Sequence, residues 1–482
     1  MVLKMSRFGL AAEIPETPFS DASAICRLSA PELAARYRSK ELSPVDATLA
    51  ALDRAEAINP AYNAFTLIDR EAAVSAAKAS EARWQKGEPL SPIDGVPTTL
   101  KDIVWVKDWS VRYGSRTTGA SPYPEDAPSV ALLRQKGAIF IGQTTTPEFG
   151  WKAVTDSALF GVTRNPWNAE KTSGGSSGGA AVAAATGAGV LHLGTDGGGS
   201  IRVPASFSGI VGLKPTFGRV PAFPGSAFGT VAHIGPMART VASAQAMLTA
   251  MSGRDLRDWS QGPGDLGSLA PTADVLRGSR FGYWARPASG TVDPEIATAI
   301  ERAIRTLEAQ GAIVEPIELP GSDHLAIFNT LWFSGAAARL NAVPPGQRAG
   351  IDPGFLEAAA IGSGFSAVDL VNAQVRRAEF GAAMDQLLAK YDFLVSPGTA
   401  IPAFGAGREL PEGSSMQRWT EWAGFSFPIN LTQQPALIVP CAMTAARLPI
   451  GLQIVGARGA DARVLGAGAE FERATPEFWR AV

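Results

Sequence analysis

Histidine and cysteine are scarce in this chain of 482 residues, which contains three histidines and two cysteines. Cys26 and Cys441 lie far apart and lack the spacing of metal ligands, so neither a disulfide framework nor a zinc site is expected. We predict that both thiols are buried or chemically neutral. This cysteine usage favours a reducing compartment, the cytoplasm.

None of the three histidines has a setting that suggests catalysis. A Ser-His-Asp hydrolase needs a histidine to accept the serine proton. His192 falls in an expected strand, His233 stands near glycine, and His324 lies in weakly patterned sequence. We interpret all three as structural. A serine nucleophile in this chain would therefore need another base, and lysine can serve if burial keeps it neutral.

The chain also lacks an excess of charge of one sign and a long hydrophobic run. Its 43 basic and 45 acidic residues nearly balance, which disfavours nucleic acid and anionic membranes and favours a small-molecule partner. The least polar run, residues 180–193, is shorter than the ~20 residues that span a membrane. Near the N-terminus, Lys4 and Arg7 precede an apolar stretch that Glu13 interrupts, so we expect no export signal.

Apolar residues make up 46% of the sequence and are spread evenly, without a charged or low-complexity linker. We therefore predict one domain over residues 1–482. Residues 29–87 are expected to form an outer layer of three helices. Ser29 and Ser43 are expected to be N-caps, and Gly87 is expected to end the third helix. Strands and helices then alternate, which is typical of an α/β sheet. The expected strands are 95–106, 138–141, 280–284, 312–319, 393–395, 436–439 and 451–455, and the expected helices include 128–136 and 294–310.

Periodicity is weakest between about residues 320 and 430, where aromatic residues are frequent. Aromatic residues in irregular segments form either a satellite core or a pocket wall, and long loops over a site often carry specificity. We predict that this region contributes to a substrate pocket or a lid. Its aromatic residues are Phe328, Trp332, Phe333, Phe355, Phe365, Trp419, Trp422, Phe425 and Phe427.

Two glycine-rich loops that carry serine stand out, at residues 174–179 and 194–200. They bracket a run of small residues that can form a buried helix, and they allow backbone N–H groups to approach a ligand. Lys101 ends an apolar run that is expected to be a strand, where lysine is rare without a function. The three features together indicate a site for chemistry.

At these residues the chain resembles the amidase signature family. The segments that carry the resemblance are 95–102, 128–148, 163–168, 174–216 and 430–436. The long central block is the specific part, whereas glycine-serine loops alone would be a weak signal. The resemblance implies a single α/β domain with a twisted mixed β-sheet flanked on both faces by helices, and a catalytic core at 95–216.

The resemblance also implies the reactive residues. Ser200 matches the nucleophile, Ser176 matches a second serine 24 positions before it that follows a cis peptide bond, and Lys101 matches the base. The implied reaction is hydrolysis of a carboxamide through an acyl-enzyme, with Ser176 as a proton relay. It needs no cofactor and no metal. A homodimer is compatible with this interpretation.

The loop at 197–200 is expected to supply backbone N–H donors to the oxyanion, because side chains there would block the substrate. These residues are Gly197, Gly198, Gly199 and Ser200. Three neighbours are predicted to hold the loops rather than react: Asp196, Arg202 and Ser177. By the same resemblance, Gly150 and Trp151 line the substrate cavity, with Trp151 as a flat apolar wall unless it packs into the core.

Two residues depart from the family pattern, Thr145 where asparagine is common and Gln433 where glycine is common. Both leave the reaction class unchanged but put the substrate in doubt. Three alternatives to an amidase stay open. The first is a hydrolase of carbamates, aryl amides or esters with the same triad, the second is the glutaminase subunit of a tRNA-dependent amidotransferase, and the third is a binding protein on an inactive scaffold.

Overall fold

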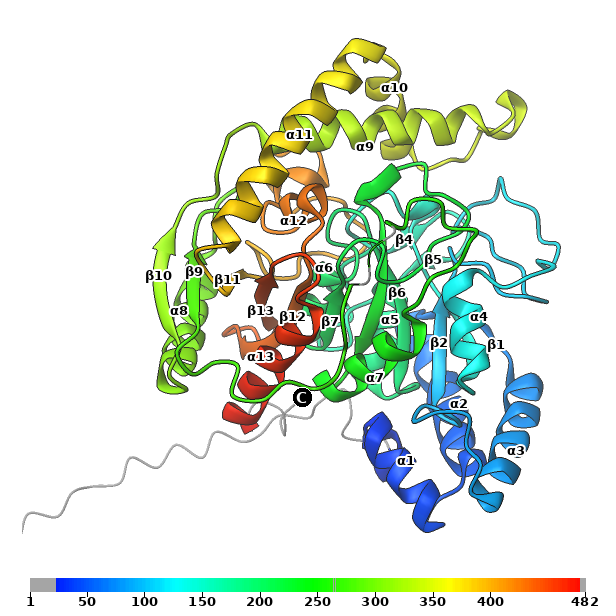
Figure 1. The fold of residues 1–482 in the computed structure, drawn as a ribbon. Helices are drawn as coiled ribbons and strands as arrows, with labels where there is room; N and C mark the ends of the chain where they lie inside the picture. The colour runs from blue at the N-terminus through cyan, green and yellow to red at the C-terminus, as the bar shows by residue number, and fades with distance from the viewer. Residues whose placement is uncertain (1–22, 263, 265, 477–482) are drawn as a thin grey trace, which may run out of the picture.

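An 11-stranded mixed sheet forms the centre of the computed structural model, which describes residues 23–262, 264 and 266–476 (Figure 1). The strand order is β1-β3-β2-β6-β8-β7-β12-β13-β11-β9-β10. Neighbouring strands are parallel in the group β3-β2-β6 and in the group β11-β9-β10, and antiparallel elsewhere. The predicted α/β fold with a mixed sheet is confirmed.

The strands of this sheet are β1 Phe65–Ile68, β2 Pro97–Lys101, β3 Ile139–Thr144, β6 Leu191–Asp196, β7 Val211–Lys214, β8 His233–Ala238, β9 Arg280–Trp284, β10 Ile313–Ile317, β11 Phe393–Pro397, β12 Ala436–Met443 and β13 Pro449–Gly456. A separate pair consists of β4 Asp156–Ser157 and β5 Gly161–Val162. The α-helices are α1 Ala30–Ser39, α2 Pro44–Tyr62, α3 Arg70–Lys86, α4 Pro128–Gln135, α5 Gly178–Thr186, α6 Arg202–Ser208, α7 Val241–Met251, α8 Pro294–Ala309, α9 His324–Asn341, α10 Pro353–Ser363, α11 Ala367–Leu388, α12 Phe427–Thr432 and α13 Asp461–Ala474.

Helices pack on the sheet through two large clusters of buried side chains. The first cluster includes residues of α1, α4, α7, α8 and α13, and the second those of α9, α10 and α11. In Figure 1 the α9–α11 group lies at one end of the molecule and α1–α3 at another. Helix α5 is buried along its whole length, because alanine and glycine let the strands approach it closely.

The N-terminal helical layer begins as predicted. Ser29 and Ser43 cap α1 and α2 in capping boxes, each with proline in the first turn. Gly87 ends α3 in the left-handed conformation, with φ 77°. A short edge strand, β1, also lies between α2 and α3 and was not predicted. Its four residues are too few to show an alternating pattern.

The segment from about 320 to 430 is more regular than predicted, since it contains the helices α9, α10 and α11. Their periodicity is weak for a physical reason. In α9, Phe328, Leu331, Trp332 and Phe333 are all buried on adjoining sides of the helix. A helix that is apolar on most sides has no polar stripe to reveal its period.

Among the described residues, no single helix is long and apolar enough to cross a membrane. Helices α10 and α11 pass this test only together, and they are bent by 96° where they meet. Cys26 and Cys441 are both free thiols. The prediction about Lys4, Arg7 and Glu13 concerns residues outside the described part of the chain.

Candidate active site

Strand geometry brings the glycine-serine loops and the predicted lysine together. Strands β2 and β6 are parallel neighbours, so their carboxyl ends lie at the same edge of the sheet. Lys101 is the last residue of β2, and Thr195 and Asp196 are the last two of β6. The Ser177 N–H donates to the Ser200 carbonyl oxygen at 3.0 Å, which joins the two predicted loops beside the lysine.

The Lys101 amino group is completely buried and contacts three hydroxyl groups. Its Nζ lies 2.6 Å from Ser176 Oγ, 2.9 Å from Ser177 Oγ and 2.8 Å from Thr195 Oγ1. Burial lowers the pKa of Lys101 well below its usual value, and the negative charge of Asp196 opposes this shift only in part. No carboxylate of the described chain lies within ion-pair distance of Lys101. A neutral amine in this setting can accept a proton from a hydroxyl group.

The loop before α5 holds Ser176 beside this lysine. The peptide bond between Gly175 and Ser176 is cis, as the resemblance implies. A Cβ atom on Gly175 would lie 2.4 Å from the backbone carbon of Val154, so only glycine fits. Thr155 Oγ1 donates to the Gly174 carbonyl oxygen at 2.9 Å and accepts from the Gly178 N–H at 3.1 Å. The loop is therefore fixed on both sides of Ser176.

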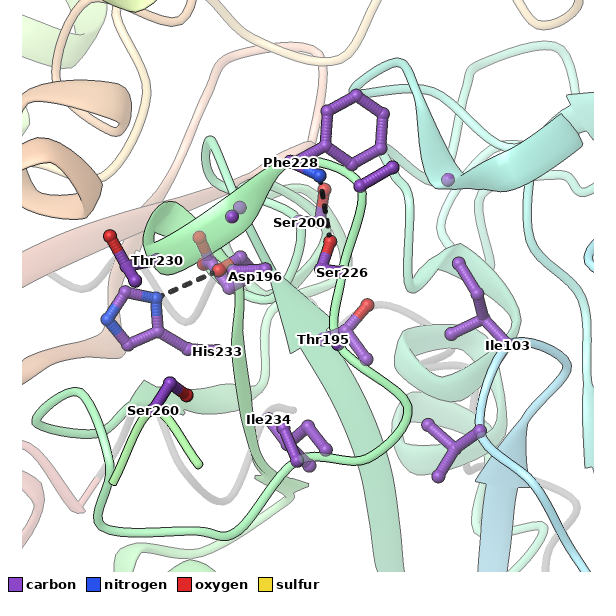
Figure 2. A pocket seen from close by; sticks show the side chains of 18 of the residues that line it. Ile103, Thr195, Asp196, Ser200, Ser226, Phe228, Thr230, His233, Ile234 and Ser260 are labelled. Carbon is purple, nitrogen blue, oxygen red and sulfur yellow. Dashed lines mark hydrogen bonds between the residues drawn. The ribbon is translucent and has the colours of Figure 1, made fainter. Parts of the chain in front are cut away.

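Ser176 and Ser200 open onto a cavity of about 380 Å³ (Figure 2). Their exposed fractions are only 2% and 4%, so each serine reaches the cavity through a small part of its surface. Gly150 and Gly197 also line the cavity, whereas Gly198 and Gly199 do not. A cavity of this volume is within the usual range for small-molecule sites.

The loop at 197–200 offers fewer free donors than predicted. The Gly199 N–H already donates to Asp196 Oδ1 at 2.8 Å, so it is not available to an oxyanion. In the described structure the N–H groups of Gly197, Gly198 and Ser200 have no such acceptor. A Cβ atom on Gly198 would lie 2.6 Å from the Trp419 ring, which explains glycine at that position.

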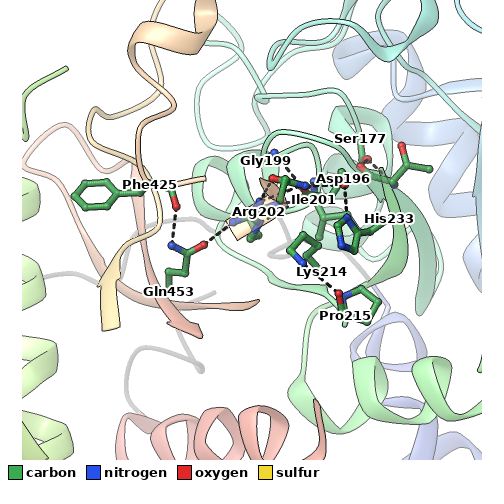
Figure 3. Close-up of polar contacts among 12 residues, drawn as sticks. Ser177, Asp196, Gly199, Ile201, Arg202, Lys214, Pro215, His233, Phe425 and Gln453 are labelled. Carbon is green, nitrogen blue, oxygen red and sulfur yellow. Dashed lines mark hydrogen bonds and ion pairs between the residues drawn. The ribbon is translucent and has the colours of Figure 1, made fainter. Parts of the chain in front are cut away.

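A buried polar network holds this loop from beneath (Figure 3). The Asp196 carboxylate accepts from the Ile201 N–H at 3.1 Å and forms an ion pair with Arg202 at 3.0 Å. Arg202 also donates to the side chains of Asn430 and Gln453. Burial alone would raise the pKa of Asp196, but the Arg202 guanidinium holds it well below the usual value. Asp196 is thus an anion that anchors the loop.

Trp151 does not form a wall of the cavity, and this corrects the interpretation favoured from the sequence. Its side chain is fully buried and is not among the residues that line the cavity, and its ring centroid lies 6.2 Å from that of Phe355. The residue before Gly150, Phe149, lines the cavity instead. Trp332 of α9 also lines it and donates to the Trp151 carbonyl oxygen at 3.0 Å.

The segment between β7 and β8 supplies much of the cavity wall and was missed in the sequence. It contributes three aromatic residues, Phe217, Phe223 and Phe228, and the Phe228 ring stacks on Trp332 at 3.8 Å. Glycine, proline and serine are frequent there, which predicts only a loop. Tyr113 and Arg339 also line the cavity, and no motif marks either residue.

One histidine, His233, lies on the cavity wall. Figure 2 shows its ring apart from Ser200, with Asp196 between them in the view. The His233 Nδ1 lies 2.8 Å from the Val231 carbonyl oxygen, which can only accept, so Nδ1 carries a proton. Burial and the nearby Lys214 lower the pKa of His233 well below the usual value. Its imidazole is therefore a weak base.

The other two histidines lie away from the cavity. Burial lowers the pKa of His192 to about 3, and its Nδ1 lies 2.8 Å from Thr99 Oγ1. The His324 Nε2 lies 2.9 Å from the Pro320 carbonyl oxygen at the start of α9. Neither ring lines the cavity.

Known proteins of one family match nearly the whole chain. A family model described as Amidase matches residues 46–465. An acylamidase from Rhodococcus erythropolis is 34% identical over 457 residues, which cover 93% of this chain and 96% of that protein. A subunit of the glutamyl-tRNA(Gln) amidotransferase from Myxococcus xanthus is 34% identical over 477 residues, covering 93% and 98%. A solved bacterial aryl acylamidase, described as an amidase signature enzyme, superimposes with a TM-score of 0.86 at 28% identity, covering 95% of this chain and 99% of that one.

Proposed function

The chain belongs to the amidase signature family and is a hydrolase of carbon–nitrogen bonds in linear amides, and we propose that it acts through a Ser200 acyl-enzyme. The observation that carries the proposal is the environment of Lys101. Its buried amino group contacts three hydroxyl groups, and two of the residues that carry them, Ser176 and Thr195, line the cavity together with Ser200. A neutral lysine so placed can replace the histidine of a Ser-His-Asp triad.

In the proposed first half-reaction, Ser200 Oγ attacks the amide carbonyl carbon as its proton passes to Ser176. Ser176 in turn gives its own proton to Lys101 Nζ, and the negative charge of Asp196 partly stabilises the resulting cation. When the tetrahedral intermediate collapses, the same protons return through Ser176 to the leaving nitrogen. Water then attacks the acyl carbon after the amine has left, with Lys101 again as the base. The bond between that carbon and Ser200 Oγ breaks, the proton passes to Ser200, and the carboxylic acid is released.

The negative charge on the tetrahedral oxygen needs donors that are fixed before the reaction. We assign this role to the N–H groups of Gly197, Gly198 and Ser200, which have no acceptor in the described structure. One such donor is worth about 3 kcal/mol in related chemistry. Asp196 and Arg202 act by keeping the loop in place.

The cavity walls favour substrates with an aryl or other bulky apolar group. Phe149, Phe223, Phe228 and Trp332 line it, and Gly150 leaves space next to Ser176. An apolar contact raises kcat/KM only when the substrate fills the space. The similarity to an aryl acylamidase fits this preference.

The deciding experiment is a hydrolysis screen with purified enzyme and its Ser200→Ala variant. Aliphatic, aryl and peptide amides, carbamates, esters and glutamine are offered, and a serine-directed fluorophosphonate is used to label the nucleophile. We expect amide hydrolysis and labelling by the parent and neither by the variant. Substantial turnover by Ser200→Ala would contradict the proposal, and failure of the parent to label would favour a binding protein on an inactive scaffold.

A second candidate function is that of a glutaminase component, which rests on the similarity to glutamyl-tRNA(Gln) amidotransferase subunits. That function requires partner polypeptides. Co-purification of the chain with a second polypeptide, together with hydrolysis of glutamine in preference to aryl amides, would favour it. Recovery as a single polypeptide that cleaves aryl amides would favour the amidase.

We also propose that the enzyme works in the cytoplasm on a small amide, alone or as a homodimer. The free thiols Cys26 and Cys441 support a reducing compartment. Sedimentation analysis of the purified chain would distinguish a monomer from a dimer.

A further inference from the structure

Arg339 of α9 places a guanidinium group at the cavity wall. The group lies over two aromatic rings, 4.5 Å from the Phe149 centroid and 5.3 Å from the Tyr113 centroid. The side chain is half-buried, and both rings also line the cavity. The flat faces of the two rings therefore support one side of the cation.

Among the described residues, the Arg339 side chain has no anionic partner. The carboxylates that share the cavity wall, by contrast, are engaged by donors of the protein. Asp196 pairs with Arg202. Asp258 accepts from the Ala222 N–H at 2.8 Å and from Ser260 Oγ at 2.6 Å. Across the described residues, the Arg339 guanidinium makes neither a salt bridge nor a hydrogen bond and has only its two ring contacts. Its donors are thus available to a ligand.

The two rings under Arg339 are held in place by an unusual backbone. Tyr113 and Phe149 both have left-handed conformations, with φ values of 54° and 53°, which are rare for bulky residues and occur often at functional sites. The Phe149 N–H donates to the Tyr113 carbonyl oxygen at 2.8 Å. The Asp102 carboxylate accepts from the N–H groups on either side of Tyr113, those of Arg112 and Gly114. Asp102 directly follows Lys101, so the base and the ring support belong to one segment.

The segment that carries Phe149 also brings Arg339 close to the proposed reacting groups. Phe149 directly precedes Gly150, where a Cβ atom would lie only 3.4 Å from Ser176 Oγ. A substrate that reaches Ser200 past Gly150 would therefore extend over Phe149 towards the guanidinium. Planar guanidinium groups match carboxylates with two parallel hydrogen bonds.

We propose that Arg339 binds a carboxylate group of the substrate, so that the enzyme prefers amides that carry an anionic group at the end remote from the scissile bond. This inference rests on the proposed amidase function. It names the class of substrate, amides with a free carboxylate, and identifies Arg339 as the residue that determines specificity for it.

The test compares carboxylate-bearing amides with neutral substrates of similar shape. For a carboxylate on the amine side, the pair is 4-acetamidobenzoate and 4-nitroacetanilide. For a carboxylate on the acyl side, it is the monoanilide of adipic acid and hexananilide. The ratio of kcat/KM within each pair is measured for the parent and for Arg339→Met, so differences in leaving-group reactivity cancel. Methionine retains apolar contact with the rings but removes the charge.

We expect Arg339→Met to lower the carboxylate-to-neutral ratio about 10- to 100-fold for one of the two pairs, as expected for loss of a charged hydrogen bond. Arg339→Lys should keep part of the preference for carboxylate-bearing amides, and added salt should reduce this preference in the parent. Arg376 is exposed on the neighbouring helix α11, and Arg376→Met serves as the matched control that leaves the ratios unchanged. Thermal unfolding of each variant checks its stability.

If the kcat/KM ratio is unchanged in both pairs, including the case in which kcat/KM falls equally for charged and neutral members, the inference is overturned. Arg339 would then only cover the two rings. Binding of the same four compounds to Ser200→Ala, measured by calorimetry with and without Arg339→Met, tests the carboxylate site separately from turnover. Selective loss of carboxylate binding supports the site even if the amidase function fails. Equal binding of charged and neutral compounds in both backgrounds contradicts it.

Discussion

Lys101 and Lys214 are both completely buried, and each ends a strand of the same sheet. Burial lowers the pKa of both amines well below the usual value. Their hydrogen-bond partners differ. Within the part of the chain that the structure describes, the polar contacts of the Lys101 amine are all with hydroxyl groups, whereas the Lys214 amine donates to the carbonyl oxygens of Pro215 and Gln434. A lowered pKa alone therefore does not identify a catalytic base.

The difference matters because a carbonyl oxygen can only accept a hydrogen bond, while a hydroxyl group can both accept and donate. A proton can move from Ser176 to Lys101, but no proton can come to Lys214 from its carbonyl partners. Ser176 also lines the cavity, whereas Lys214 does not. We infer that Lys101 is the catalytic lysine and that Lys214 positions the backbone around Gln434.

The largest expected effect separates the two lysines directly. Lys101→Met and Ser200→Ala should each lower kcat/KM for amide hydrolysis by about 10⁴-fold or more, since one removes the base and the other the nucleophile. Lys214→Met, the matched control, should retain activity within about tenfold of the parent. Steady-state kinetics on an aryl amide provide the measurement. Similar losses at both lysines, in variants as stable as the parent, would remove the distinction.

Ser176→Ala tests the hydroxyl group that connects Lys101 to the nucleophile. We expect a loss of about 10²- to 10³-fold in kcat/KM, because a water molecule can replace the hydroxyl in part. Combining Ser176→Ala with Lys101→Met should cost far less than the product of the single losses, since residues that act as a unit are not additive. Independent, multiplicative losses would argue against a relay.

Gly150→Leu tests whether the substrate occupies the cavity beside Ser176, the residue that contacts Lys101. The added side chain would enter the cavity beside Ser176 and Ile103, so kcat/KM should fall about 10- to 200-fold for aryl or long-chain amides and much less for small aliphatic amides. Gly413→Leu is the matched control, because Gly413 also has a positive φ but no atom near its Cβ position. Equal losses on large and small amides would place Gly150 outside the substrate path.

The smallest expected effect is on stability. Because the pKa of Lys101 is lowered in the folded state, the unfolded chain binds one more proton between that pKa and ~10.4. The free energy of unfolding of the parent, relative to Lys101→Met, should therefore rise with pH across this window by up to about 1.4 kcal/mol per pH unit. Chemical denaturation from pH 7 to 10 measures it. A constant difference over this range would mean that Lys101 is protonated in the native state.

The sequence marked the residues that we propose to be catalytic more clearly than it marked the cavity around them. Lys101, Ser176 and Ser200 stand in segments with specific spacing, and the fold brings Lys101 and Ser176 within 2.6 Å. Residues 217–232 and Arg339 could not be identified, because a glycine-rich loop and a single helical arginine have no pattern that indicates a cavity. Trp151 was misplaced because the sequence does not show which of the two aromatic residues that flank Gly150, Phe149 or Trp151, turns towards the cavity.

The N–H donors of residues 197–200 show a similar limit of prediction from the sequence. Glycine spacing predicted four N–H groups, but only the three-dimensional position of the Asp196 carboxylate shows that Gly199 is already engaged. The helices between residues 324 and 388 were likewise hidden, since burial of α9 on several sides removes the amphipathic pattern. Local motifs carry the chemistry, whereas the shape of the cavity depends on packing between distant segments.

The pH dependence of kcat/KM distinguishes Lys101 from a histidine as the base, because His233 is the one histidine on the described cavity wall and thus the rival base. We predict that kcat/KM rises as Lys101 loses its proton, with a midpoint below the pKa of ~10.4 of free lysine, and stays high in mild alkali. This profile should persist in His233→Asn and when His192, His233 and His324 are replaced together. A midpoint that moves, or a limb that disappears, in the histidine variants would contradict it and make a histidine the base.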